Sequence, residues 1–166
     1  MPTAPKTLDD LFLDTLKDVY FAEKTLLATL TKLAEAARST DLKSLFEKHH
    51  SETERQIHRL EAVFAIINSE PQGRSCAAIV GLAEEAATIV EEYKDSPALD
   101  AGLLSVAQAV EHFEIARYGT LIAWAEELGL DDAVTLLDET LEEEEATYET
   151  LAEIEKTAVN QQAHAA

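Results

Sequence analysis

Hydrophobic residues recur at alternating steps of three and four along most of the chain, separated by polar and charged positions. This spacing is the pattern of long amphipathic helices that pack nearly parallel to one another. A shorter amphipathic stretch lies in the middle, between the breaks at Pro71–Gly73 and Asp95–Pro97. We therefore expect four long helices, over about residues 7–37, 41–68, 98–128 and 131–158, and a crossover helix over about 76–94.

Polar residues and glycine mark the expected helix ends. Thr7 is a candidate N-cap because Asp10 follows three residues later, an acidic variant of the capping box. Ser39, Thr40 or Asp41 can cap the second helix, and Asp131 or Asp132 the fourth long helix. Gly129 is expected to end the third long helix as a C-terminal cap.

The two halves of the chain carry a weak repeat. A shift of 91 positions without a gap aligns Glu23 with Glu114, Asp41 with Asp132 and Glu52 with Glu143. We interpret this as a duplicated helical hairpin whose two copies are joined by the crossover segment. The fold class predicted for residues 1–166 is a single all-α domain, a four-helix bundle with up-down-down-up topology.

Composition and charge narrow the range of functions. The 166 residues are 46% hydrophobic, enough for a sizeable core, and the formal net charge is -20. This charge argues against nucleic-acid and membrane-surface partners, which require clustered Lys and Arg. Cys76 is the only cysteine, and the first residues lack the basic-then-apolar order of a signal peptide. We expect a cytoplasmic protein.

Acidic residues interrupt the apolar stripes at positions where a core residue is expected. Glu23 lies seven residues after Leu16 and seven before Leu30. Glu111 and Glu114 are three residues apart and therefore share a helix face, as do His49 and Glu52. The candidate metal ligands from all four long helices are Glu23, His49, Glu52, Glu111, Glu114, Glu143 and Glu144.

Carboxylates gathered in one interior require neutralisation, because an isolated buried carboxylate costs several kcal/mol. Two iron or manganese ions are the simplest neutralising cofactor, since helical bundles hold such pairs with Glu and Glu-x-x-His residues. The alternative is that individual Glu residues are solvated at the bundle edge and that His49 is a core histidine. Among the four consecutive acidic residues, the spacing from Leu137, Leu141 and Leu151 predicts that Glu144 points inward.

Several strings resemble the YciF/YciE group of ferritin-like, rubrerythrin-like bacterial stress proteins. They are DVYFAEK at 18–24, HHSET at 49–53, RLE at 59–61, EHFEIARYGTL at 111–121 and LEEE at 141–144. The resemblance implies a ferritin-like bundle, a homodimer and a dinuclear metal site in a protein associated with stress responses. It matches Glu23, Glu52, Glu111, Glu114 and one of Glu143 or Glu144 to positions of the group, and His49 to a histidine typical of it.

The chain departs from a rubrerythrin-type pattern, which places Glu-x-x-His on the second and fourth long helices. The corresponding positions are Thr53-x-x-Gln56 and Glu144-x-x-Thr147. Two functions therefore stay open, and with them whether the protein is an enzyme. One is a metal-binding stress protein that reacts with peroxide or oxygen. The other is a non-enzymatic structural or interaction protein with a degenerate or stabilising metal site.

Overall fold

The computed structural model describes residues 5–156 and 160–163, and all regular structure in this part of the chain is helical. The predicted boundaries of the first three long helices and of the crossover helix lie within two residues of those observed. The predicted end at residue 158 lies outside the described residues. The helices are α1 (Leu8–Ala36), α2 (Thr40–Ile66), α3 (Ala77–Glu92), α4 (Leu99–Glu127), α5 (Asp131–Ile154) and α6 (Asn160–Ala163).

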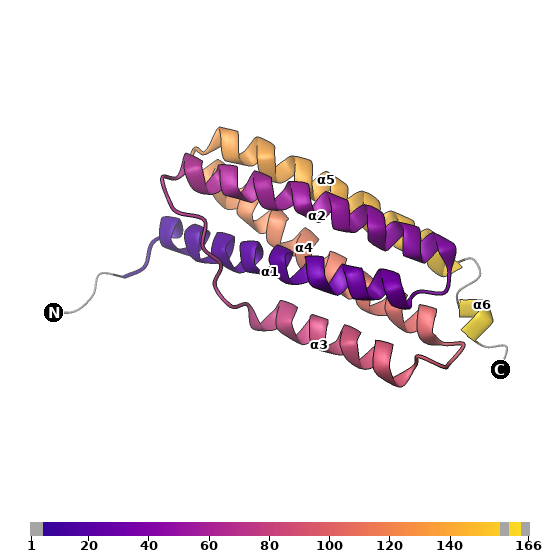
Figure 1. Ribbon diagram of the computed structural model, residues 1–166. Coiled ribbons are helices and arrows are strands. Elements are labelled where there is room, and N and C mark those ends of the chain that lie inside the picture. The colour runs from indigo at the N-terminus through magenta and orange to yellow at the C-terminus, as the bar shows by residue number, and fades with distance from the viewer. Residues whose placement is uncertain (1–4, 157–159, 164–166) are drawn as a thin grey trace.

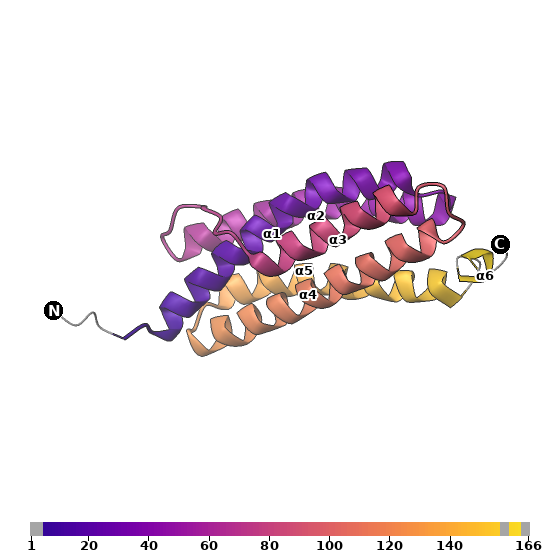
Figure 2. The same ribbon diagram turned by 90° about the horizontal axis from the view of Figure 1, so that it is seen from below.

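The four long helices form one bundle in which α1 packs on α2 and α4 packs on α5 (Figure 1). α2 returns antiparallel to α1, and α3 then runs back along the bundle, so that α4 starts at the end where α2 began. This gives the predicted up-down-down-up order. α3 contacts both α1 and α4 and lies over the junction between them (Figure 2).

The helix ends mostly carry the expected caps. Thr7 and Asp10 form a reciprocal capping box at α1, and Ser39 caps α2. Gly129 has φ +69 just after α4, a conformation that glycine adopts without strain. The predicted cap of α5 was wrong. Leu130 occupies the N-cap position without a side-chain bond, and Asp131 is already helical, where its charge favours the positive helix end.

A buried carboxylate holds the turn between α1 and α2. Asp100, in the first turn of α4, accepts hydrogen bonds from the backbone N–H groups of Arg38 and Ser39 at 2.9 and 2.8 Å. The Arg38 guanidinium in turn donates to the carbonyls of Lys94 and Ser96, which precede α4. The α1–α2 turn is therefore fastened to the α3–α4 connection.

We expect Asp100→Ala to lower the free energy of unfolding by about 2–4 kcal/mol. The change leaves the backbone N–H groups of Arg38 and Ser39 without the charged carboxylate that accepts their hydrogen bonds. Urea denaturation measures the change. Asp138→Ala, an exposed change on α5, is the matched control and should alter stability by less than about 0.5 kcal/mol. Equal effects of the two changes would show that the Asp100 bonds do not stabilise the turn.

The apolar core consists of two clusters separated along the bundle axis. One cluster contains Leu26, Phe46 and Leu151 together with the buried side of α3. The other contains Leu16, Phe64 and Leu137 at the opposite end. Between them each long helix places polar side chains in the interior, so a polar layer crosses the middle of the bundle. The buried members of this layer are Glu23, His49, Glu52, Thr53, Gln56, Glu111, Glu114, Thr140, Glu144 and Thr147.

Candidate metal centre

The polar layer contains a compact group of one histidine and three carboxylates. His49 comes from α2, Glu111 and Glu114 from α4, and Glu144 from α5. None of the four residues exposes more than 2% of its surface. Helical spacing explains the arrangement: Glu111 and Glu114 share one face of α4, and Glu144 follows Leu137 and precedes Leu151 on the buried stripe of α5. The inward orientation predicted for Glu144 is confirmed.

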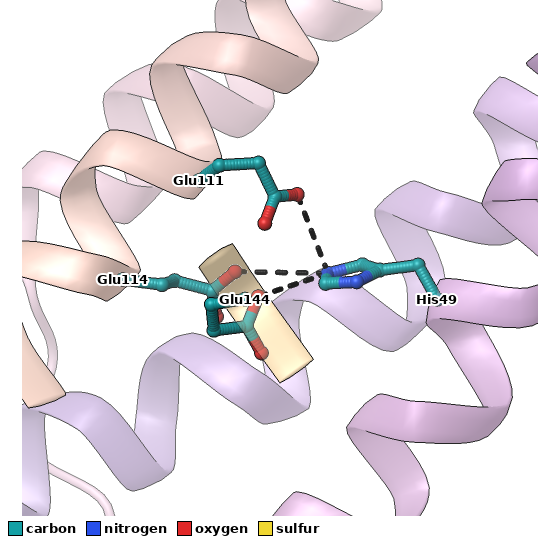
Figure 3. Close-up of side chains that lie close together, drawn as sticks. All are labelled: His49, Glu111, Glu114 and Glu144. Carbon is teal, nitrogen blue, oxygen red and sulfur yellow. Dashed lines mark ion pairs between the residues drawn. The ribbon is translucent and has the colours of Figure 1, made fainter. Parts of the chain in front are cut away.

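The three carboxylates surround one edge of the imidazole ring (Figure 3). His49 Nε2 lies 3.6 Å from a Glu111 oxygen, 3.7 Å from a Glu114 oxygen and 3.8 Å from a Glu144 oxygen. These separations are too long for good hydrogen bonds. All four residues offer one ligand atom each within 4.8 Å of one another.

This geometry fits a metal ion better than direct pairing. Ligand atoms about 2.0–2.2 Å from a common ion lie about 3–4 Å apart, so only small side-chain movements are required. Many polar atoms of the group lack a hydrogen-bond partner: both ring nitrogens of His49, both oxygens of Glu114, and one oxygen each of Glu111 and Glu144 are buried without a hydrogen bond. Buried polar atoms left unpaired in this number are rare in proteins. The group could therefore hold a metal ion.

Glu23 lies beside this group and is fully buried on α1. The hydroxyl of Tyr118 donates a hydrogen bond to Glu23 Oε1, while Glu23 Oε2 has no hydrogen-bond partner. Tyr118 is itself fully buried, so its ring packs in the core while its hydroxyl contacts a carboxylate. Tyr118 thus fixes one oxygen of Glu23 and leaves the other available for a ligand.

Glu143 and Glu144 are adjacent in sequence but have different surroundings. Gln56 Nε2 donates to Glu143 at 3.1 Å and also to Glu144, so one amide links both carboxylates. The guanidinium of Arg59 donates two hydrogen bonds to the Glu143 carboxylate, at 2.8 and 2.9 Å. Glu143 is therefore a paired residue at the margin of the layer, and the structure does not bring it into the His49 group.

Glu52 occupies the other margin of the layer, on α2. Its Oε1 lies 2.6 Å from Lys48 Nζ and 4.0 Å from Arg55, both of which are exposed cations. Its Oε2 is buried and has no hydrogen-bond partner. Glu52 thus connects the protein surface to the interior, whereas the four-residue group lies deeper.

The electrostatics of the layer follow from burial and from the number of like charges. Desolvation, reinforced by neighbouring carboxylates, raises the pKa values of Glu23, Glu111 and Glu114 well above the ordinary value of 4.5, and it also raises that of Glu144. Desolvation would likewise raise the pKa of Glu143, but the bonds from Arg59 outweigh it and hold that pKa low. Burial therefore favours the protonated form of these four carboxyl groups, and a bound cation would compete with their protons.

Arg59, which borders the layer, and Thr147, which belongs to it, were not among the predicted site residues. Arg59 neutralises Glu143, and Thr147 places a buried, unpaired hydroxyl on the same face of α5 as Glu144. Arg59 lies three residues after Gln56 and seven after Glu52, a spacing that puts all three on one helix face. That spacing could have revealed the arginine, whereas nothing in the sequence distinguishes Thr147 from other threonines.

No helix in the described part of the chain is both long and apolar enough to cross a membrane.

The sequence of this chain is similar to a protein family and to a named relative. The sequence model of a family described as "Domain of unknown function (DUF892)" matches residues 7–164. Protein YciF of Escherichia coli strain K12 is 43% identical over 159 residues, which cover 95% of this chain and 96% of that protein.

Two solved structures share the fold at high identity. The crystal structure of the E. coli stress protein YciF matches with a TM-score of 0.89 and 42% identity, covering 95% of this chain and 99% of that chain. YcfI, a proposed structural protein from Rhodopseudomonas palustris, matches with a TM-score of 0.84 and 45% identity, covering 92% and 97%. The predicted resemblance to the YciF group and the predicted ferritin-like helical fold are confirmed.

Proposed function

This chain belongs to the DUF892 family, and from that premise we propose that it is a stress-response protein that binds two iron or manganese ions and reacts with oxygen or peroxide. The observation that carries the proposal is the set of unpaired buried ligand atoms on His49, Glu111, Glu114 and Glu144. A bundle interior that keeps these atoms unpaired is costly unless a cation satisfies them.

The two ions would use different parts of the layer. The first would be held by the His49 group, which supplies one nitrogen and three carboxylate oxygens. The second would be shared between Glu114, whose two oxygens both lack a partner, and the free Oε2 of Glu23. Oxygen-rich ligands with one imidazole suit iron or manganese better than thiolate-preferring metals.

The residues around the ligands would orient the ligand carboxylates through hydrogen bonds. Two ferrous ions supply two electrons, enough to reduce hydrogen peroxide and two protons to two molecules of water. Burial raises the pKa of the Tyr118 hydroxyl well above the ordinary value of 10.0, so the hydroxyl would stay protonated and donate its hydrogen bond to Glu23. Gln56 orients Glu144 through its amide. Such outer contacts fix the direction of a ligand.

Metal analysis tests the proposal directly. Protein loaded anaerobically with Fe²⁺ and passed through a desalting column should retain about two ions per chain, and the Glu23→Ala, Glu114→Ala double variant should retain almost none. Loaded wild-type protein should then consume peroxide faster than the same concentration of free Fe²⁺. Equal metal content in the two proteins would contradict the proposed ligands, and equal rates would contradict the reaction.

A second candidate is a structural or interaction protein with a stabilising metal site. It is favoured by Thr53 and Gln56, which stand where a rubrerythrin-type site has glutamate and histidine, and by the amide link from Gln56 to Glu143 and Glu144. This candidate predicts metal-dependent stability without turnover. Light scattering would test the homodimer that the family resemblance implies for either function.

A further inference from the structure

Two neighbouring side chains of α2 each leave a buried oxygen without a hydrogen-bond partner. Glu52 is 7% exposed and Gln56 is fully buried, and the oxygens concerned are Glu52 Oε2 and Gln56 Oε1. The two residues are four apart on one helix, so they are neighbours on the same helix face. Both atoms are acceptors, and neither can satisfy the other. A buried pair of acceptors without a donor points to a cation or a water molecule as their partner.

Two carboxylates of α5 lie against the same Gln56 amide. α2 and α5 pack side by side (Figure 1), and Gln56 Nε2 donates to Glu143 at 3.1 Å and also to Glu144. Burial and, to a smaller extent, the charge of Glu52 raise the pKa of Glu144, so Glu52 interacts electrostatically with the His49 group. The unpaired oxygens of Glu52 and Gln56 therefore lie at the α2–α5 interface, beside the candidate metal centre.

Two exposed cations contact the other oxygen of Glu52. Glu52 Oε1 lies 2.6 Å from Lys48 Nζ and 4.0 Å from an Arg55 nitrogen, and that same nitrogen lies 3.5 Å from Glu143 Oε1. The Arg55 guanidinium thus stands between two carboxylates, a position that a small cation could also take. The side chains of Lys48 and Arg55 are 57% and 54% exposed. Ion pairs made by such exposed side chains contribute little to stability, so an entering ion can displace them at small cost.

The ligand atoms at this place are all oxygens. Arg59 already donates to both oxygens of Glu143, so the free ligands are Glu52 Oε2 and Gln56 Oε1. A carboxylate and an amide oxygen suit a hard divalent cation such as Ca²⁺ or Mn²⁺, which completes its coordination shell with water. A site with so few protein ligands binds weakly, with a dissociation constant on the order of 1 mM. The net charge of -20 attracts such cations to the protein.

We propose that Glu52 and Gln56 form an outer cation site, which binds one hard divalent cation between α2 and α5 in exchange with solvent. The site uses none of the four ligands of the His49 group, so it goes beyond the two tightly held ions proposed above. An ion bound here would replace the contact of Arg55 with Glu52 and would give the two buried oxygens their missing partner. An ion held this weakly leaves on a desalting column, so the expected retention of about two ions per chain is unaffected.

Mn²⁺ titration of the Glu114→Gln protein tests the outer cation site with the His49 group disabled. Paramagnetic Mn²⁺ should broaden the NMR signals of the Gln56 side-chain amide, with half of the effect at about 1 mM. Glu52→Gln in the same background should raise that concentration about tenfold or more, because it removes the charged ligand. Glu54→Gln is the matched control, because Glu54 is exposed on the same helix, and it should leave the titration unchanged.

A gain in affinity provides a test that misfolding cannot imitate. Arg55→Ala removes the guanidinium that competes for Glu52, so it should bind Ca²⁺ about two- to fivefold more tightly than the otherwise unchanged protein. Lys43→Ala removes the same charge from an exposed position of α2 and is the matched control. It should change the affinity by less than about 1.5-fold, because salt screens distant charges. Chemical shifts of the Gln56 side-chain amide follow the binding in each protein.

The outcomes separate the outer cation site from the proposed function. No response of the Gln56 amide to either ion up to about 10 mM would mean that water satisfies the two oxygens, and would overturn the site. An unchanged titration in Glu52→Gln, or equal affinities in Arg55→Ala and Lys43→Ala, would also overturn it. The metal centre is tested separately by the iron retained after desalting. A protein that retains no iron but shows both expected responses would contradict the proposed function and support the outer cation site.

Discussion

Glu114→Gln should stabilise the metal-free protein and, at the same time, abolish its stabilisation by metal. Glu114 is buried among Glu23, Glu111 and Glu144, and neither of its oxygens has a hydrogen-bond partner. Glutamine has nearly the same shape, carries no charge and adds an amide that can donate to the neighbouring carboxylates. Replacing buried ion pairs by uncharged residues of similar volume is often neutral or stabilising by about 1–4 kcal/mol, because the desolvation cost of the charges disappears. We expect a gain in this range at pH 8.

The loss of metal binding should be larger. Glu114 contributes to the His49 group and would also share the second ion with Glu23. Changes in outer contacts alone weaken metal sites about 10–100-fold, so loss of a direct carboxylate ligand should exceed that range. Saturation of the wild-type protein with Mn²⁺ at about 1,000 times its dissociation constant should add about 4 kcal/mol of stability. The variant should gain almost none.

Thermal unfolding with chelator and with Mn²⁺ measures both effects. Glu126→Gln is the matched control because Glu126 is exposed on the same helix, and it should behave like wild type in both conditions. A metal-free Glu114→Gln protein less stable than wild type would mean that the carboxylate is satisfied without a cation. A preserved response to Mn²⁺ would remove Glu114 from the ligand set.

The fold could be predicted largely because its signal is repeated many times along the chain. Each long helix carries a stripe of apolar residues over several turns. The helical period is therefore recognised even if one residue is wrongly assigned to the core or to the surface. The inward position of Glu144 followed from the same spacing. The cap of α5 could not be predicted in this way, because Leu130 takes the N-cap position through its backbone alone and makes no side-chain bond.

The site was less predictable because its contacts join different helices. The 91-residue shift aligns Glu52 with Glu143, but it also aligns Thr53 with Glu144, and this second pair is fully buried in the structure. The interior faces of α2 and α5 therefore differ in chemistry although the hairpins are related. Whether Glu143 points to a metal or to Arg59 depends on a residue 84 positions away, which spacing within one helix does not reveal.

The stability of the metal-free protein should fall as the pH rises above 4.5, the ordinary pKa of a glutamate, and added metal should cancel the decline. Burial raises the folded-state pKa values of Glu23, Glu111, Glu114 and Glu144 above the ordinary 4.5. Below that value the folded and unfolded states are both protonated, and the stability is intact. As the pH rises from the unfolded value toward the folded-state values, the unfolded chain releases protons that the folded protein still retains, so stability is lost until the folded groups ionise as well.

Carboxylates with lowered pKa values do not change the stability over this range of pH. Glu61, Glu143 and Asp14 contribute stability that is lost only when the pH falls below their ordinary values of 3.8 to 4.5. Each raised group therefore adds a decline of about 1.4 kcal/mol for every unit by which its folded-state pKa exceeds the unfolded one. Metal removes the decline because bound carboxylates are already deprotonated, so binding itself releases protons.

Urea denaturation at four pH values gives the free energy of unfolding against pH, as one curve with chelator and a second curve with Mn²⁺. The difference between them should grow with pH in wild-type protein, and calorimetry in buffers of different ionisation enthalpy should detect proton release on metal binding near pH 6.5. Glu114→Gln should flatten the chelator curve, since it removes one of the raised groups, and Glu126→Gln should not. A chelator curve that rises or stays level over this range of pH would mean that the buried carboxylates are stabilised as anions by the protein alone.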